Sequence, residues 1–119
     1  MIDVGRLEDF PERSVTVLAA GRLEIGLVRW DGDALYALRN VCPHERGPLC
    51  AGRLGPRLVA EAGDPFTVAV DQTRPVLTCA WHGWEFDVQT GQALVAGSRY
   101  RAKTYPVRLQ DGRVLVGVP

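Results

Sequence analysis

Residues 79–87 read Cys-Ala-Trp-His-Gly-Trp-Glu-Phe-Asp, and residues 42–44 read Cys-Pro-His. Each stretch contains one cysteine and one histidine, and together they hold both histidines of the chain. In an extended segment alternate side chains point to the same side, and a tight turn can bring together residues three apart. We therefore expect two loops that share one site, which could take zinc or an iron–sulfur cluster. The candidate ligands are Cys42, His44, Cys79 and His82.

Length and composition predict a single globular domain. The chain has 119 residues, of which 46% are hydrophobic and 24% are charged, so it can bury one core but not two. Fourteen Lys and Arg residues balance fourteen Asp and Glu residues. Because proteins that bind nucleic acid carry an excess of clustered positive charge, this balance argues against a nucleic-acid partner.

The sequence shows no signal for a membrane or for export. Its apolar runs are far shorter than the roughly 20 residues that span a bilayer. The first residues show neither the basic segment nor the apolar stretch of a signal peptide. We therefore expect a cytoplasmic protein without a membrane partner. Its three cysteines are an odd number, and in a reducing compartment this favours metal binding over a disulfide framework.

The hydrophobic pattern predicts an all-β fold. Apolar residues alternate with polar ones or form short runs bounded by Gly, Asp and Pro, and no stretch has the period of a helix. Gly21-Arg22 and Asp111-Gly112 predict tight hairpin turns, residues 62–65 predict another turn, and residues 71–75 predict a loop. The expected strands are residues 14–20, 24–30, 34–38, 57–61, 66–70, 76–78, 85–88, 92–95, 105–109 and 113–118.

The pairing of ligand types distinguishes between the candidate metals. Structural zinc sites commonly take two cysteines from one segment and two histidines from a following helix. This chain has mixed pairs and no predicted helix. One thiolate and one imidazole from each loop suit two unlike irons, with both thiolates on one iron and both imidazoles on the other.

The two stretches and their surroundings resemble the Rieske 2Fe-2S family. The second stretch, with Thr90-Gly91, is the more specific part, and the first is followed by Pro48-Leu49 and Gly52-Arg53-Leu54. The resemblance implies one Rieske-type 2Fe-2S cluster and an antiparallel β-sandwich with two cluster-binding loops at one tip. It covers most of the chain, so we expect a single Rieske domain over residues 1–119. The 34 residues between the loops exceed the usual interval in the family, and the surplus fits a hairpin insertion at residues 55–75.

The resemblance implies a soluble ferredoxin that passes one electron from a reductase to an oxygenase or another redox protein. An oxygenase would need a second, mononuclear iron, commonly held by two histidines and a carboxylate. Both histidines already belong to the ligand set, so we expect an electron carrier and not an enzyme. Two alternatives remain open. One is the Rieske small subunit of a larger oxidoreductase such as nitrite reductase, and the other is a zinc-stabilised interaction module.

At three positions the chain departs from the high-potential members of the family, and these differences bear on the reduction potential. High-potential Rieske proteins have a serine two residues after the second ligand histidine, a tyrosine four residues after it, and a disulfide between the loops. Trp84, Phe86 and Trp81 stand at the corresponding positions here. Because hydrogen bonds to the cluster stabilise its reduced form, the resemblance predicts the lower-potential, ferredoxin-like class. We expect both tryptophans to shield the cluster from water.

Two further residues raise structural questions. Arg46 stands where the family usually has glycine, so either Arg46 adopts a positive φ at an energetic cost or Gly47 takes over the turn. Cys50 has no matching cysteine in the second loop. We expect it to be packed beneath the loop as a small apolar residue, because unpaired cysteines are usually buried.

Overall fold

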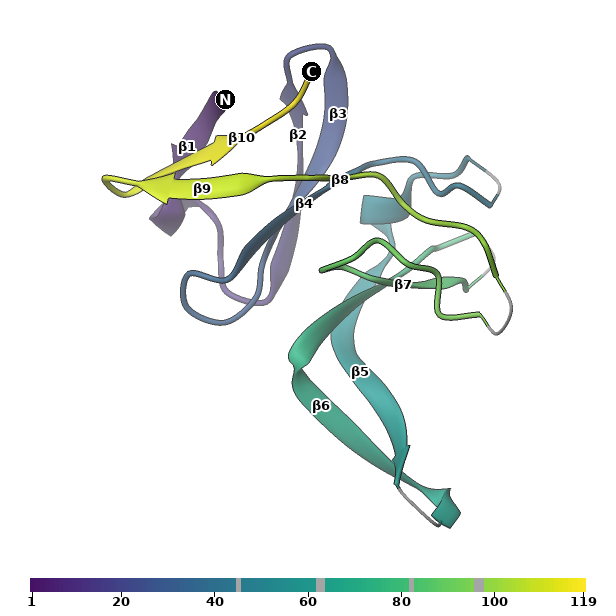
Figure 1. Cartoon of the computed structure of the whole chain (residues 1–119). Coiled ribbons are helices and arrows are strands. Elements are labelled where there is room, and N and C mark those ends of the chain that lie inside the picture. The colour runs from purple at the N-terminus through teal and green to yellow at the C-terminus, as the bar shows by residue number, and fades with distance from the viewer. Residues whose placement is uncertain (45, 62–63, 82, 96–97) are drawn as a thin grey trace.

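The structure is a computed structural model that describes residues 1–44, 46–61, 64–81, 83–95 and 98–119 (Figure 1). Its described strands form three antiparallel sheets, in the orders β1-β10-β9, β2-β3-β4-β8 and β5-β6-β7. The expectation of an all-β fold is confirmed. The strands are β1 (Ile2–Arg6), β2 (Ser14–Ala20), β3 (Leu23–Arg29), β4 (Leu35–Arg39), β5 (Arg53–Glu61), β6 (Asp64–Thr78), β7 (Glu85–Asp87), β8 (Thr104–Tyr105), β9 (Val107–Gln110) and β10 (Arg113–Val116).

The described helices are two single 3-10 turns, η1 (Leu7–Asp9) and η2 (Leu49–Ala51). No helix in the described part of the chain is long and apolar enough to cross a membrane.

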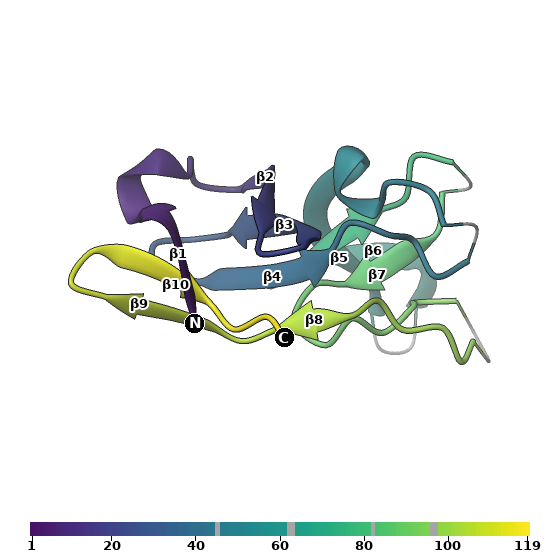
Figure 2. The ribbon, with the colours of Figure 1, turned by 90° about the horizontal axis from the view of Figure 1, so that it is seen from above.

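Two buried clusters hold the sheets together. One lies between the first two sheets, where side chains of β3 such as Ile25 and Leu27 pack with Val114 and Val116 of β10. The other lies beneath the two cysteine-containing loops and joins strands from the second and third sheets. Seen from above, the first sheet lies at one end of the molecule and the two loops lie at the other (Figure 2). The first cluster thus forms a sandwich core that supports the second.

The expected hairpin turns are present, with one strand split in two. Asp111 and Gly112 have φ angles of 52° and 76°, the backbone that a two-residue hairpin turn requires. The expected strand 105–109 is interrupted at Pro106, which has no N–H to donate to a sheet. Tyr105 therefore ends β8 and pairs with β4, while Val107 begins β9 and pairs with β10.

The β5–β6 hairpin is longer than the sequence predicts. The expected arms, 57–61 and 66–70, extend to the full length of both strands, and the hairpin projects from the rest of the molecule (Figure 1). The expected turn at residues 62–65 begins at residues that lie outside the described part. The stretch 76–78, expected as a separate strand, is the end of β6.

The prediction of a loop at residues 71–75 is wrong, because these residues belong to β6. The register changes from Pro56 opposite Pro75 to Arg57 opposite Asp71, so three residues of β6 bulge out of the pairing. The Trp30 indole Nε1 donates a hydrogen bond of 2.6 Å to the carbonyl of Gln72 within this bulge. The bulge is therefore bonded both locally, where the Asp71 carboxylate accepts hydrogen bonds from Thr73, and to Trp30, which directly follows β3.

The stretch expected as a strand at 92–95 forms only isolated bridges, from Ala93 to Phe86 and from Gln92 to Arg101. The turn before it is held by Asp87, whose buried carboxylate accepts hydrogen bonds from the backbone N–H groups of Gln89 and Thr90. The same carboxylate accepts a hydrogen bond of 3.2 Å from the Arg74 guanidinium. Asp87 thus connects the turn after β7 to β6.

Candidate metal centre

The two cysteine-containing loops lie at the same end of the molecule. The first loop follows β4 and leads into η2, and the second connects β6 to β7 (Figures 1 and 2). Both loops leave strands of antiparallel sheets, whose register fixes the position of each strand end. Ligands that are far apart in the sequence are therefore carried by two supported strand ends.

The two loops have the same backbone hydrogen bonds. Cys42 N–H donates to the carbonyl of Gly47 at 2.7 Å, and Cys79 N–H donates to the carbonyl of Trp84 at 2.7 Å, five residues on in each case. The carbonyl of each cysteine accepts a bond from the N–H four residues on, which is Arg46 in the first loop and Gly83 in the second. Each cysteine is therefore held at the start of the same type of tight turn.

The fourth residue after each cysteine adopts a left-handed backbone. Arg46 has a φ of 60° and Gly83 has a φ of 69°. Of the two alternatives for the first loop, the structure shows that Arg46 itself takes the turn. Gly47 serves another purpose, because a Cβ atom there would lie 2.6 Å from Cδ2 of Trp81. The turn therefore tolerates an arginine in a conformation that L-residues rarely adopt.

We predict opposite effects for two substitutions at this turn position. Arg46→Gly should raise the free energy of unfolding by up to about 1 kcal/mol, because the relief of a left-handed backbone exceeds the entropy cost of glycine. Gly83→Ala should lower it by about 1 kcal/mol, because a Cβ at Gly83 meets no atom within 4 Å and only the backbone is strained.

Denaturant unfolding of the two variants and the parent protein measures both effects. A loss of stability in Arg46→Gly would contradict the strain at Arg46.

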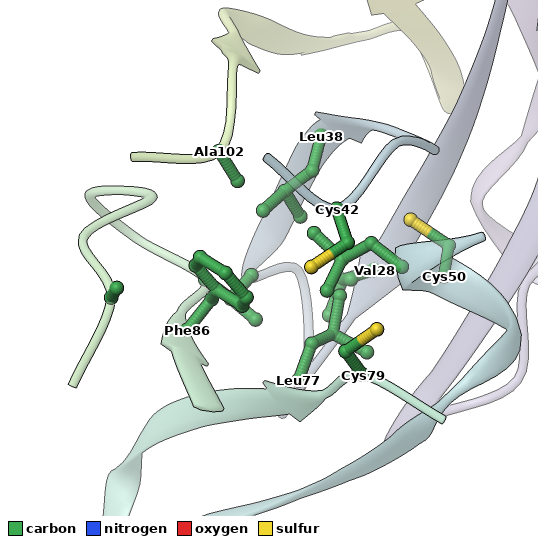
Figure 3. Packing of buried hydrophobic residues seen from close by; sticks show 11 residues of the cluster. Val28, Leu38, Cys42, Cys50, Leu77, Cys79, Phe86 and Ala102 are labelled. Atoms are coloured by element: carbon green, nitrogen blue, oxygen red, sulfur yellow. The ribbon is translucent and has the colours of Figure 1, made fainter. Parts of the chain in front are cut away.

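The two cysteine side chains are buried together beneath the loops. Cys42 and Cys79 belong to one cluster with Leu77 and Phe86, and Figure 3 shows how these side chains lie. The backbones of the two loop regions also touch, because a Cβ on Gly52 would collide with the carbonyl oxygen of Thr78. Apolar burial and direct backbone contact thus fix the relative positions of the two thiols.

His44 is half-buried and lies within a group of aromatic rings. Its imidazole stacks on the Trp84 indole, with ring centroids 3.9 Å apart and an angle of 14° between the planes. Tyr100 meets the His44 ring edge-on, with centroids 5.9 Å apart. The His44 Nδ1 atom is buried. The fourth candidate ligand, His82, lies outside the described residues.

The chemistry of these donors fits an iron–sulfur cluster. Buried thiol sulfurs next to apolar side chains are soft ligands in a site shielded from water, and an imidazole held by stacking offers a nitrogen ligand of fixed orientation. Among the described residues, no group of three or more His, Cys, Asp and Glu side chains is placed to hold a single metal ion. The three described candidates are nevertheless brought to one end of the fold.

The positions that carry hydroxyl groups in high-potential Rieske proteins carry rings here. Trp84 stacks on His44, and Phe86 is fully buried beside Cys42 and Cys79. Of the two tryptophans expected to shield the site, Trp84 is half-buried, whereas Trp81 is 59% exposed and covers Gly47. Sequence reasoning missed Tyr100, although an aromatic residue directly after a glycine-containing loop is a signal that could have indicated it.

Cys50 is buried beneath the first loop, as expected from the sequence. Its backbone N–H donates to Oδ1 of Asn40 at 2.7 Å, and Asn40 in turn donates to Glu24. Its sulfur lies against Gly26, where a Cβ would collide with it. Burial raises the pKa of the Cys50 thiol to about 12, so it remains protonated in the folded chain at neutral pH.

We predict that Cys50 makes the protein less stable at high pH. Its pKa rises from 9.0 in the unfolded chain to about 12 in the folded chain, so above pH 9 the unfolded state alone loses the proton. The free energy of unfolding should then fall by at most about 1.4 kcal/mol per pH unit.

Denaturant unfolding at pH 8, 9 and 10 measures this fall, with Cys50→Ala as the control. The other two cysteines are common to both proteins, so the difference between their slopes isolates Cys50. Equal slopes would show that its pKa is not raised.

Comparison with known proteins now assigns the fold. The model of the Rieske 2Fe-2S domain matches residues 1–106. The chain belongs to the Rieske 2Fe-2S family. Its Ralstonia sp. relative, the ferredoxin component of naphthalene 1,2-dioxygenase/salicylate 5-hydroxylase systems, is 30% identical over 115 residues, which cover 97% of the chain and 92% of the relative. The ferredoxin component of the alkene monooxygenase system of Xanthobacter autotrophicus is 28% identical and covers 98% of the chain and 80% of that relative.

Solved structures share the same Rieske fold. The ferredoxin of carbazole 1,9a-dioxygenase from Nocardioides aromaticivorans IC177 has a TM-score of 0.69 and 24% identity, covering 98% of this chain and 97% of that one. A structure described as a NADH-dependent nitrite reductase small subunit from Mycobacterium tuberculosis has a TM-score of 0.74 and 18% identity, covering 96% and 90%. The expected Rieske fold and family are confirmed, and the family cofactor is a Rieske-type 2Fe-2S cluster.

Proposed function

We propose that this Rieske protein is a one-electron carrier. Its cluster would be bound by Cys42 and Cys79 on one iron and by His44 and His82 on the other. The observation that carries the proposal is the pair of matching loop turns, which place two buried thiols and a stacked imidazole at one end of the fold. When bound, such a cluster accepts and returns one electron at a time.

The other side chains of the site prepare it for electron transfer. Phe86 and Leu77 exclude water from the thiol side of the site, since both are fully buried next to the cysteines. Trp84 orients His44 by stacking, and His44 stays partly exposed. An electron can therefore pass through the histidine side to a partner, while the thiol side stays dry.

We further propose that the chain is an accessory component and not an independent enzyme. Both of its histidines belong to the proposed ligand set, which leaves none for a mononuclear iron. The chain is proposed to be one domain over residues 1–119, with residues 55–75 as an insertion between the loops. Its odd number of cysteines suits the cytoplasm.

The partners that suit this carrier are a reductase as electron donor and an oxygenase as acceptor. Its relatives are named as ferredoxin components of dioxygenase and monooxygenase systems. Gel filtration of a native extract would instead show a permanent larger complex if the chain were a nitrite reductase small subunit.

We predict that cysteine substitutions distinguish the two proposed thiolate ligands from the third cysteine. Cys42→Ala and Cys79→Ala should each lose the cluster, because one thiolate cannot hold an iron in its place. Cys50→Ala is the matched control and should retain it, because the Cys50 side chain is an uncharged thiol packed against Gly26.

Iron and sulfide assays should give two of each per chain in the parent protein, and electron paramagnetic resonance after dithionite reduction should show a mixed-ligand signal. A colourless protein containing zinc, or a Cys50→Ala variant without iron, would refute the proposed ligand set.

We predict that Trp84 determines how long the cluster stays bound. Trp84→Leu removes the ring stacked on His44 and should increase the rate of iron loss by about 3- to 10-fold, the equivalent of an aromatic stacking interaction. Trp84→Phe keeps a ring at this position and should restore most of the lifetime. The decay of visible absorbance in the presence of an iron chelator measures both rates, and equal rates in all three proteins would exclude this role.

A further inference from the structure

Positive charge gathers in a cleft beside the first loop. The cleft has a volume of about 490 Å³, and the described residues of its lining include four basic side chains and no carboxylate. Pro43, which separates two of the proposed ligands, forms part of the same wall. The basic residues are Arg39, Arg46, Arg101 and Lys103.

These residues come from two segments that run side by side. Arg39 ends β4 and its N–H donates to the carbonyl of Lys103 at 2.9 Å, so the segment before β8 lies along the first loop. Ala102, between the two later cations, packs into the cluster that contains Cys42 and Cys79. The cleft therefore borders the candidate metal centre.

The cations of the cleft are not neutralised within the described structure. Other arginines form ion pairs, for example Arg13 with Asp31 at 2.8 Å and Arg113 with Asp3 at 2.9 Å. None of the four cleft residues forms an ion pair with a described carboxylate. The chain as a whole has no net charge, whereas the described lining of the cleft has four positive charges.

Exposed aromatic rings lie at the same end of the molecule. Trp81 is 59% exposed and covers Gly47, next to Arg46 in the first loop. Tyr100 is 43% exposed and precedes Arg101. Tryptophan, tyrosine and arginine are the residue types that are enriched in protein–protein interfaces.

From these observations, and resting on the proposed electron-carrier function, we propose that the basic cleft and its flanking aromatic rings dock an acidic face of a protein redox partner. Complementary charge would orient the partner so that its redox group approaches the histidine side of the site. All four cations are exposed side chains, which suits a hydrated protein face. A site for a small anion would instead require buried polar groups that converge on one point.

The test compares two variants with the same change of charge. Arg101→Glu/Lys103→Glu reverses two charges in the cleft, and Arg22→Glu/Arg108→Glu reverses two exposed charges outside it. Neither pair contains a proposed metal ligand. Iron content and the paramagnetic resonance spectrum should be unchanged in both, which shows that each variant still holds its cluster.

The readout is the rate at which each reduced protein is oxidised by an acidic plastocyanin and, separately, by a basic cytochrome c. Each productive encounter transfers one electron from the protein to the Cu(II) of plastocyanin, which becomes Cu(I), and no bond is formed or broken. For the parent protein, the rate with plastocyanin should fall as ionic strength rises, because the attraction is screened.

The cleft variant should react with plastocyanin at least about tenfold more slowly than the parent at low ionic strength, and the control variant less than about threefold more slowly. Equal losses in the two variants, or a parent rate that does not depend on salt, would overturn the docking site.

Saturable binding of inorganic phosphate with a Kd below about 1 mM, measured by calorimetry and lost in the cleft variant, would also overturn it, because the cleft would then be a small-anion site. If the proposed carrier function fails, the parent protein transfers no electron to either acceptor. If only the docking site fails, it transfers electrons to both without preference for charge.

Discussion

The direct contact between the backbones of the two loop regions is the constraint on which the metal centre depends. Donors separated by a long stretch of chain must lie side by side, and Gly52 allows this because it has no Cβ to collide with the Thr78 carbonyl. The same tight turn then places Cys42 and Cys79 in equivalent positions. With a pair of equivalent turns, each segment could supply one thiolate to one iron and one imidazole to the other.

Two buried polar side chains, Asn40 and Asp87, connect the loop regions to the strands beside them. Asn40 connects the first loop region to β3, because its amide bonds both Glu24 and the Cys50 backbone. Asp87 connects the turn after the second loop to β6. Both side chains are buried and each forms hydrogen bonds to a segment far away in the sequence, so they hold these segments together. A redox site benefits from such rigidity, because its surroundings need to change little when charge arrives.

Local patterns in the sequence predicted the parts of the structure that local chemistry controls. The alternation of apolar residues indicated most strands, and Asp111-Gly112 indicated its hairpin turn. The family resemblance predicted the Rieske fold, which is confirmed, whereas its four ligands stay a prediction. The bulge in β6 could not be predicted in this way, because its hydrogen bond to Trp30 joins residues that lie far apart in the sequence.

The surroundings of the candidate site were equally hard to predict. The stacking of Trp84 on His44 and the approach of Tyr100 depend on how three loops pack in space. The basic cleft joins Arg39 to residues that lie more than half the chain away. The choice between Arg46 and Gly47 depended on backbone angles that residue types alone leave open.

Arg46 unites two opposing demands at a single position. Its backbone adopts an unfavourable conformation, while its guanidinium contributes to the positive lining of the cleft. Glycine would suit the backbone but would bring no charge. Laboratory evolution for heat resistance alone should therefore select glycine at position 46. Such a protein would be more stable but would associate more slowly with an acidic partner, so stability and association rate favour different residues at this position.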